Sequence, residues 1–208
     1  MTDWNTRTLT VISAGLTQPS SSRLLADRLA AATVDALAGR GITADVEIVE
    51  LRDHAHALTD NLLTGFPSGG LREVVDRVAK SDGVIAVTPI FNASYSGLYK
   101  SFFDVLEPGT LDGIPVLLGA TGGTARHSLA LEHAIRPMFA YLRAATVPTA
   151  VYAASEDWAG SGDRELARRI TRAGDELARA MAARERADRV DPYADPVPFE
   201  ELLARQDL

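Results

Sequence analysis

The sequence predicts one α/β domain, a doubly wound parallel sheet with helices on both faces. Short apolar runs alternate with longer segments in which apolar residues recur every three or four positions, as happens when strands and helices alternate. Residues 83–87 (Gly-Val-Ile-Ala-Val) have the β-branched density of a strand that is buried on both faces. The 208 residues are enough for a single domain with a sizeable core.

Three strands are predicted in the first half of the chain. Residues 9–12 form the first strand, which ends at Ser13-Ala14-Gly15. The second, at 46–51, mixes apolar and charged residues, a pattern typical of a strand near a sheet edge. Around them we expect a helix at 22–37, a mostly irregular connection at 52–70, a helix at 71–78 and the buried strand at 83–87.

A loop opens after the third strand, because Pro89 cannot donate a backbone hydrogen bond to a sheet. A helical segment then begins at Leu98. The later elements are a strand at 114–120, a helix at 128–142, a strand at 148–153 and a long helix at 163–186. We therefore expect a domain at 1–187 and a tail at 188–208 that is either flexible or docked on a partner subunit.

These elements fit a flavodoxin-like sheet of five parallel strands in the order 2-1-3-4-5, wound by right-handed crossovers. Strands one, three and four are neighbours in this order. The loops that follow them should therefore meet at one crevice at the carboxyl edge of the sheet, where open α/β sheets bind ligands.

The composition excludes several classes of function. The net charge is −7 without a run of Lys or Arg, so nucleic acid is not an expected partner. The absence of cysteine excludes disulfides, thiolate metal sites and cysteine nucleophiles, so any redox chemistry must come from a cofactor. The polar first residues and the lack of a long apolar stretch predict no membrane association and a cytoplasmic protein.

The loop after the first strand is rich in hydrogen-bond donors. Gly15 permits a tight turn, and hydroxyls together with the first N–H groups of the next helix can bind an anion. It lacks the Gly-Lys-Ser/Thr of a Walker loop and the spaced glycines of a dinucleotide fingerprint. The loop is therefore either a cradle for a phosphate monoester or a set of serines that cap a helix. The candidate residues are Ser13, Gly15, Thr17, Ser20, Ser21 and Ser22.

The loops after the third and fourth strands suit a flat ring with polar edges. The loop at 88–97 combines small hydroxyls, an amide and two aromatic rings, and a planar group can lie against the glycine backbone of Thr121-Gly122-Gly123. Arg126 is either a ligand for the phosphate of a nicotinamide cofactor or a solvated cation, and His127 either contacts a ligand or marks a helix start. His54 and His56, on opposite sides of an expected extended segment, disfavour a metal site.

The three loops, in this order, resemble those of the NADPH-dependent FMN reductase family over roughly residues 9–152. The most specific piece is Thr88-Pro89-Ile90-Phe91-Asn92-Ala93-Ser94-Tyr95-Ser96-Gly97 with Leu98-Tyr99-Lys100, which resembles the family's flavin loop with Phe91 in place of a tyrosine. Residues 117–123, Arg126-His127 and Arg136-Pro137 further resemble an actinobacterial subgroup that supplies reduced flavin to flavin-dependent monooxygenases.

The resemblance implies roles for individual residues. Ser13, Thr17, Ser20, Ser21, Ser22 and the backbone of Gly15 would hold the FMN phosphate. Pro89, Ile90, Phe91, Asn92, Ala93 and Ser94 would flank the flavin ring, and Thr121, Gly122 and Gly123 would reach its polar edge. Hydride would pass from NADPH or NADH to flavin N5, so no side chain is expected to be catalytic.

The family resemblance also implies a homodimer or tetramer assembled through the helices beside the flavin loop. Tyr95, Leu98, Tyr99, Phe102 and Phe103 would provide an aromatic surface there, unless Phe102 and Phe103 pack only into their own sheet. An electron carrier of the flavodoxin type, a quinone, azo or metal-oxyanion reductase, and a binding domain without flavin are the alternatives. The preference for NADPH or NADH and the status of FMN as prosthetic group or substrate stay open.

Overall fold

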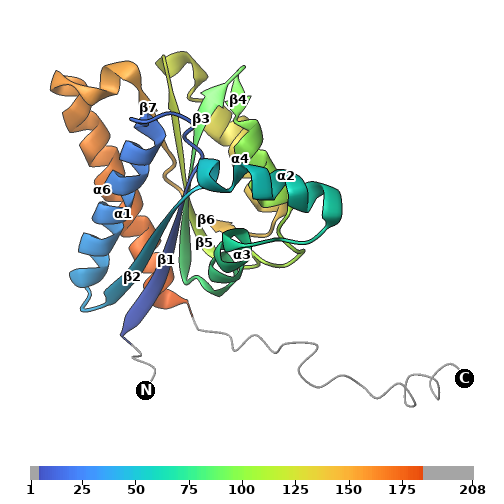
Figure 1. Ribbon diagram of the computed structural model, residues 1–208. Helices are drawn as coiled ribbons and strands as arrows, with labels where there is room; N and C mark the ends of the chain where they lie inside the picture. The colour runs from blue at the N-terminus through green and yellow to red at the C-terminus, as the bar shows by residue number, and fades with distance from the viewer. Residues whose placement is uncertain (1–4, 185–208) are drawn as a thin grey trace, which may run out of the picture.

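The computed structural model describes residues 5–184, which form a parallel sheet between two layers of helices (Figure 1). The predicted tail at 188–208 lies outside these residues. The strands are β1 (Thr6–Ser13), β2 (Thr43–Glu50), β3 (Gly83–Phe91), β4 (Ser94–Tyr95), β5 (Pro115–Gly122), β6 (Ala145–Thr146) and β7 (Val151–Ala154). The α-helices are α1 (Ser21–Ala38), α2 (Ala55–Thr64), α3 (Gly70–Lys80), α4 (Gly97–Asp104), α5 (Arg136–Tyr141) and α6 (Gly160–Ala183). No helix within 5–184 is long and apolar enough to cross a membrane.

The doubly wound parallel sheet is confirmed, but the predicted count of five strands is wrong. Seven strands lie in the described part, in the order β2-β1-β3-β5-β6, with β7 also paired to β5 and β4 paired to β3. Two short strands share the place beside β5 at the edge of the sheet: β6 pairs with the start of β5, and β7 pairs with its end. The strand predicted at 148–153 begins only at Val151, and the short strand β6 before it was not predicted; Pro148, which lies between the two, has no N–H to donate to β5.

The small strand β4 arises because the loop after β3 folds back on itself. Ile90 pairs with Tyr95 and Phe91 with Ser94, in antiparallel register. The two residues between them, Asn92 and Ala93, have φ angles of 48° and 67°. Positive φ at both central residues is the mark of the tight turns that close two-residue hairpins.

Two helical predictions need correction. The connection at 52–70 is not mostly irregular, because it contains a 3-10 helix, η1 (Leu51–His54), and α2, so that His54 and His56 do not lie on an extended segment. Helix α2 buries few side chains, so its sequence shows only a weak helical repeat of apolar residues. The helix predicted at 128–142 begins as a π-helical turn, η3 (Leu131–Ile135), and becomes α-helical at α5, where Pro137 sits in the first turn without an N–H to donate.

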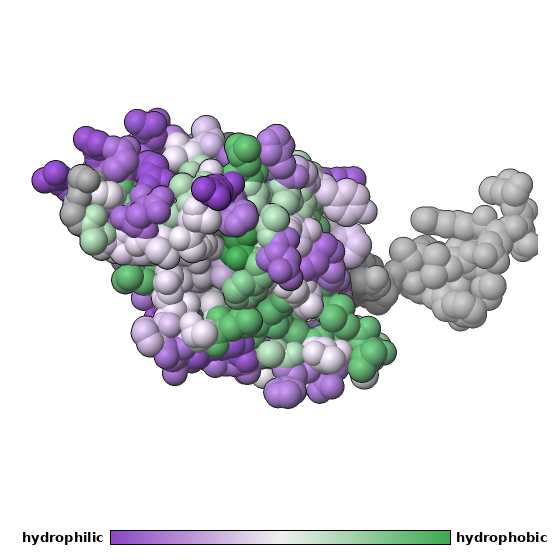
Figure 2. Space-filling model, turned by 90° about the horizontal axis from the view of Figure 1, so that it is seen from above, coloured by the Kyte–Doolittle hydropathy of each residue, from purple (hydrophilic) through white to green (hydrophobic). Residues whose placement is uncertain are grey.

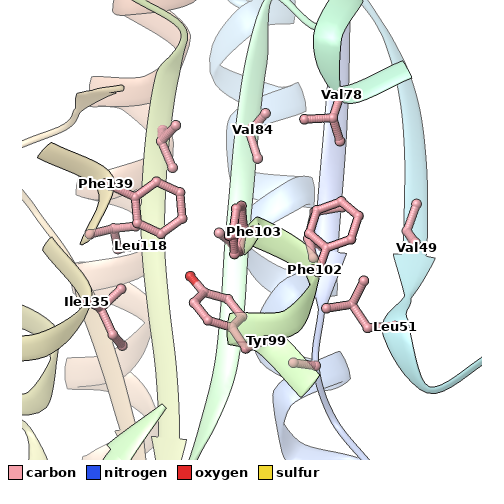
Figure 3. Packing of buried hydrophobic residues seen from close by; sticks show 14 of the residues in the cluster. Val49, Leu51, Val78, Val84, Tyr99, Phe102, Phe103, Leu118, Ile135 and Phe139 are labelled. Carbon is pink, nitrogen blue, oxygen red and sulfur yellow. The ribbon is translucent and has the colours of Figure 1, made fainter. Parts of the chain in front are cut away.

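Helices α1 and α6 cover one face of the sheet, and α2, α3, α4 and α5 pack on the other (Figure 1). The hydrophobic core on the face covered by α2, α3, α4 and α5 is built around aromatic rings (Figure 3). The Phe103 ring packs edge-to-face against both Tyr99 and Phe139, with its centroid 4.8 Å from each of theirs. Tyr99, Phe102 and Phe103 are buried in their own chain, so only Tyr95 and Leu98 of the five residues predicted to form an aromatic interface are partly exposed.

The contact between α1 and α6 depends on Gly174. A Cβ at this position would lie 2.8–2.9 Å from the backbone of Ala32 and Thr33 and from the Ala32 side chain. Because these atoms are mostly backbone, Gly174→Ala must push two helices apart, and overpacking of this kind costs about 1–3 kcal/mol. We expect urea denaturation to report that loss. Gly97→Ala is the control, since its added Cβ meets no described atom within 4 Å; equal stability of the two variants would contradict the prediction.

Candidate functional site

The loops after β1, β3 and β5 open at the same edge of the sheet, as predicted. Ser13 at the end of β1 is in register with Val87 of β3, and Pro89 of β3 is in register with Thr121 of β5. Figure 2 looks onto this edge from above Figure 1 and shows hydrophobic surface near its middle, with hydrophilic residues around it. Residues from three distant parts of the chain therefore meet at one place.

The first loop forms a tight cradle at the start of α1. Ala14 N donates to Val87 O at 2.9 Å, which ties the loop to the neighbouring strand. A Cβ on Gly15 would overlap the Ser20 hydroxyl and lie 3.0 Å from Ser20 Cβ. Ser20 in turn caps α1, with its Oγ accepting from Arg23 N at 3.2 Å. Only glycine at position 15 lets the loop close over the helix start.

One polar group in this cradle has no partner. Ser13 is fully buried, and its Oγ makes no hydrogen bond to any of the described residues. Buried hydroxyls are nearly always paired, so an exception beside a helix N-terminus indicates a place for a ligand. Helix α1 has no acidic residue in its first turn, and its N–H groups there favour an anion.

A buried hydroxyl pair joins the first loop to β5. Ser22 Oγ and Thr121 Oγ1 are 2.8 Å apart, although the residues are 99 positions apart in the chain. This contact fixes both predicted site residues, and the hydroxyl that accepts in the pair keeps its own O–H for a further partner. By contrast, Thr17 is exposed and donates to Pro19 O at 3.0 Å, and Ser21 is exposed at the helix start.

The Arg23 side chain is not a free partner for an anion. Its guanidinium contacts Asp27 and Glu50, each at 2.8 Å. The hydrogen bond to Asp27 is the main cause that raises the pKa of Arg23 above its ordinary value. Because the Arg23 guanidinium is paired with two carboxylates, the donors available to a ligand in the cradle are hydroxyls and backbone N–H groups.

The second loop is the β3–β4 hairpin. Pro89, Ile90 and Ser94 are half-buried, whereas Phe91, Asn92 and Ala93 are exposed, Phe91 by 47%. Two residues of the motif at 88–97 that were given no role by the sequence hold the hairpin in place. Thr88 Oγ1 accepts from Ser96 N at 3.1 Å, and Ser96 Oγ caps α4 by accepting from Tyr99 N at 3.2 Å. Both residues are buried, and a serine directly before a helical segment is the N-cap signal that could have identified Ser96.

The third loop follows β5. Thr121 is buried, Gly122 is half-buried and Gly123 is exposed, with no described atom within 4 Å of a Cβ added to Gly123. Arg126 and His127 lie on the short helix η2 (Ala125–His127) and are both exposed. A separate cavity of about 390 Å³, lined by residues of 103–112 and 141–143, contains none of the predicted site residues.

The comparison with protein families matches residues 8–159 to the NADPH-dependent FMN reductases. The chain belongs to this family. Within it, the chain is 35% identical to an FMN reductase (NADPH) of Pseudomonas aeruginosa over 147 residues, 71% of this chain and 76% of the relative. It is also 35% identical over 146 residues to the NADH-dependent FMN reductase SfnF of Pseudomonas putida, covering 70% of this chain and 76% of that one.

Solved structures agree with this assignment. An oxidoreductase from Corynebacterium diphtheriae superposes with a TM-score of 0.85 at 42% identity, covering 87% of this chain and all of that one. The NADH:FMN oxidoreductase EmoB gives 0.68 at 28% identity, with 81% and 88% covered. A WrbA-like flavodoxin from Agrobacterium tumefaciens, at 15% identity and a TM-score of 0.58, shows the flavodoxin-like fold alone. The protein is thus an NAD(P)H-dependent flavin reductase that uses FMN.

Proposed function

We propose that FMN binds at the carboxyl edge of the sheet, with its phosphate in the cradle between β1 and α1. The buried Ser13 hydroxyl without a partner carries this proposal, since a phosphate oxygen in the cradle would satisfy it. Ser13, Thr17, Ser20, Ser21, Ser22 and the Gly15 backbone are the proposed phosphate ligands. Hydrogen bonds to a charged group contribute about 1.5–3 kcal/mol each, so a few of them account for selective binding of the phosphorylated flavin.

The flavin ring is proposed to lie between the hairpin and the third loop. Pro89, Ile90, Phe91, Asn92, Ala93 and Ser94 would flank it, and Thr121, Gly122 and Gly123 would face its polar edge. When bound, FMN supplies the chemistry by accepting hydride from the nicotinamide at N5. The protein binds and orients FMN and the nicotinamide nucleotide and excludes water from them. This role fits a proposed site made of glycines, hydroxyls and backbone groups without an acid or base.

The nicotinamide nucleotide is proposed to enter over the exposed side of the hairpin. Arg126 and His127 are exposed at the rim and are the proposed contacts for NADPH. The relatives named above include both an NADPH-dependent and an NADH-dependent reductase, so both nucleotides are to be compared.

We further propose that the reduced flavin serves an acceptor outside this chain, namely a flavin-dependent monooxygenase, in the cytoplasm where nicotinamide nucleotides are the common reductants. Self-association as a homodimer or tetramer is also proposed. Since Tyr99, Phe102 and Phe103 are buried, the exposed apolar side chains Leu62, Leu63 and Phe66 near the end of α2 are the better candidates for such an interface. Light scattering after gel filtration tests it.

The turnover assay follows oxidation of NADPH and NADH at 340 nm by the purified protein, with and without added FMN. Activity that rises and saturates with FMN is expected, with a colourless protein after gel filtration if flavin leaves after each turnover. A retained flavin spectrum without nucleotide oxidation would identify an electron carrier and contradict the proposal.

A further inference from the structure

Tyr152 is a buried residue beside the proposed flavin edge that no sequence motif singled out. It lies on β7 and is only 4% exposed. Its hydroxyl donates to the backbone O of Thr124 at 2.9 Å, so it reaches from the last strand to the loop that follows β5. This hydrogen bond fixes the loop just beyond Gly122 and Gly123.

The same hydroxyl explains why position 122 is glycine. A Cβ on Gly122 would overlap Tyr152 Oη and lie 3.2 Å from Tyr152 Cζ. On its other side it would lie 3.9 Å from Ile90 Cβ of the hairpin. The tyrosine therefore fills the space that a side chain at 122 would need, and it does so where the second and third loops meet.

The backbone of Tyr152 is fixed by a hydrogen bond from helix α6. Arg169 of α6 donates through Nη1 to Tyr152 O at 2.7 Å, and its Nη2 contacts Asp157 at 3.1 Å. Asp157 accepts from Ala154 N at 2.8 Å, which fixes the end of β7. Burial raises the pKa of the Tyr152 hydroxyl, which therefore stays protonated and able to donate at neutral pH.

We propose that Tyr152 is a positioning residue of the flavin site, which sets the place of the Gly122–Thr124 backbone without touching FMN. The proposal rests on the location of the flavin proposed above. It extends the site from the three loops to the last strand, and it assigns the hydroxyl, not the ring, as the functional group.

The first test is Tyr152→Phe, which keeps the ring in the core and removes only the hydroxyl. One lost hydrogen bond is expected to raise the KM for FMN about fivefold to tenfold, with kcat within about twofold and the melting temperature within about 2 °C. Tyr141→Phe is the matched control, because Tyr141 is 87% exposed and lies away from the three loops. An unchanged KM, or a fall in kcat and melting temperature at unchanged KM, would overturn the proposal.

The second test is a double-mutant cycle with Gly122→Ala. Alone, this variant is expected to weaken FMN binding, because its methyl group displaces the tyrosine hydroxyl. In the Tyr152→Phe background the overlap with Oη is gone, so Gly122→Ala should weaken FMN binding several-fold less than in the wild type. Strictly additive effects would show that the hydroxyl does not act through position 122.

A Gly123→Val variant separates this proposal from the location of the flavin. If Gly123→Val weakens FMN binding while Tyr152→Phe does not, only the role of Tyr152 is wrong. If neither variant changes FMN binding, the flavin does not lie against this loop.

Discussion

Replacing Gly15 with valine is expected to weaken FMN binding by about 100-fold or more, while riboflavin binding changes little. The Cβ would overlap the Ser20 hydroxyl, and the branched methyl groups would press on Ser20 and on Ser22, whose Cβ is 3.4 Å from the same point. The loop must then open and withdraw its donors from the phosphate. Loss of two hydrogen bonds to a charged group, at about 1.5–3 kcal/mol each, corresponds to at least this factor at 1.4 kcal/mol per tenfold.

The measurement is quenching of flavin fluorescence during titration with protein, carried out in parallel with FMN and riboflavin. Gly39→Val is the control, since Gly39 lies at the other end of α1 and a Cβ there makes only ordinary contacts at 3.5 and 3.7 Å. If Gly15→Val weakened FMN and riboflavin equally, the cradle would not hold the phosphate.

Gly123→Val is expected to weaken FMN binding by about tenfold or more without lowering the melting temperature by more than about 2 °C. No described atom lies within 4 Å of a Cβ at this position, so the side chain meets nothing in the free protein. Any loss of affinity then comes from bulk on the face where the ring is proposed to lie, where a displaced ring loses the packing and hydrogen bonds that hold it.

The neighbouring variant Gly122→Val provides the contrast. Its side chain meets Tyr152 before it meets a ligand, so both stability and affinity should fall. A Gly123→Val protein that binds FMN as tightly as the wild type would show that the ring does not rest against this backbone.

Much of the architecture could be predicted because long elements carry strong patterns. The apolar run at 83–87 and the helical period at 22–37 identified β3 and α1, and the loops between them followed from where the patterns stop. Since carboxyl ends of adjacent parallel strands meet at one edge, the convergence of Ser13, Pro89 and Thr121 followed from strand order alone.

The rest depends on contacts that the local sequence does not encode. Helix α2 buries too few side chains for a helical period to stand out in the sequence, and the two-residue strand β6 before Pro148 is too short to carry a strand pattern. The pattern of Tyr99, Phe102 and Phe103 suits a buried face, but whether their own chain or a partner covers them is a tertiary fact. The Ser22–Thr121 and Tyr152–Thr124 contacts likewise join residues far apart in the chain.

The location of the flavin site is tested most directly by hydrogen–deuterium exchange of the protein with and without saturating FMN. We predict slower exchange in peptides that cover residues 13–23, 88–97 and 119–127, the three loops at the carboxyl edge. Slower exchange confined instead to 103–112 and 141–143, which line the separate cavity, would place FMN elsewhere and contradict the account.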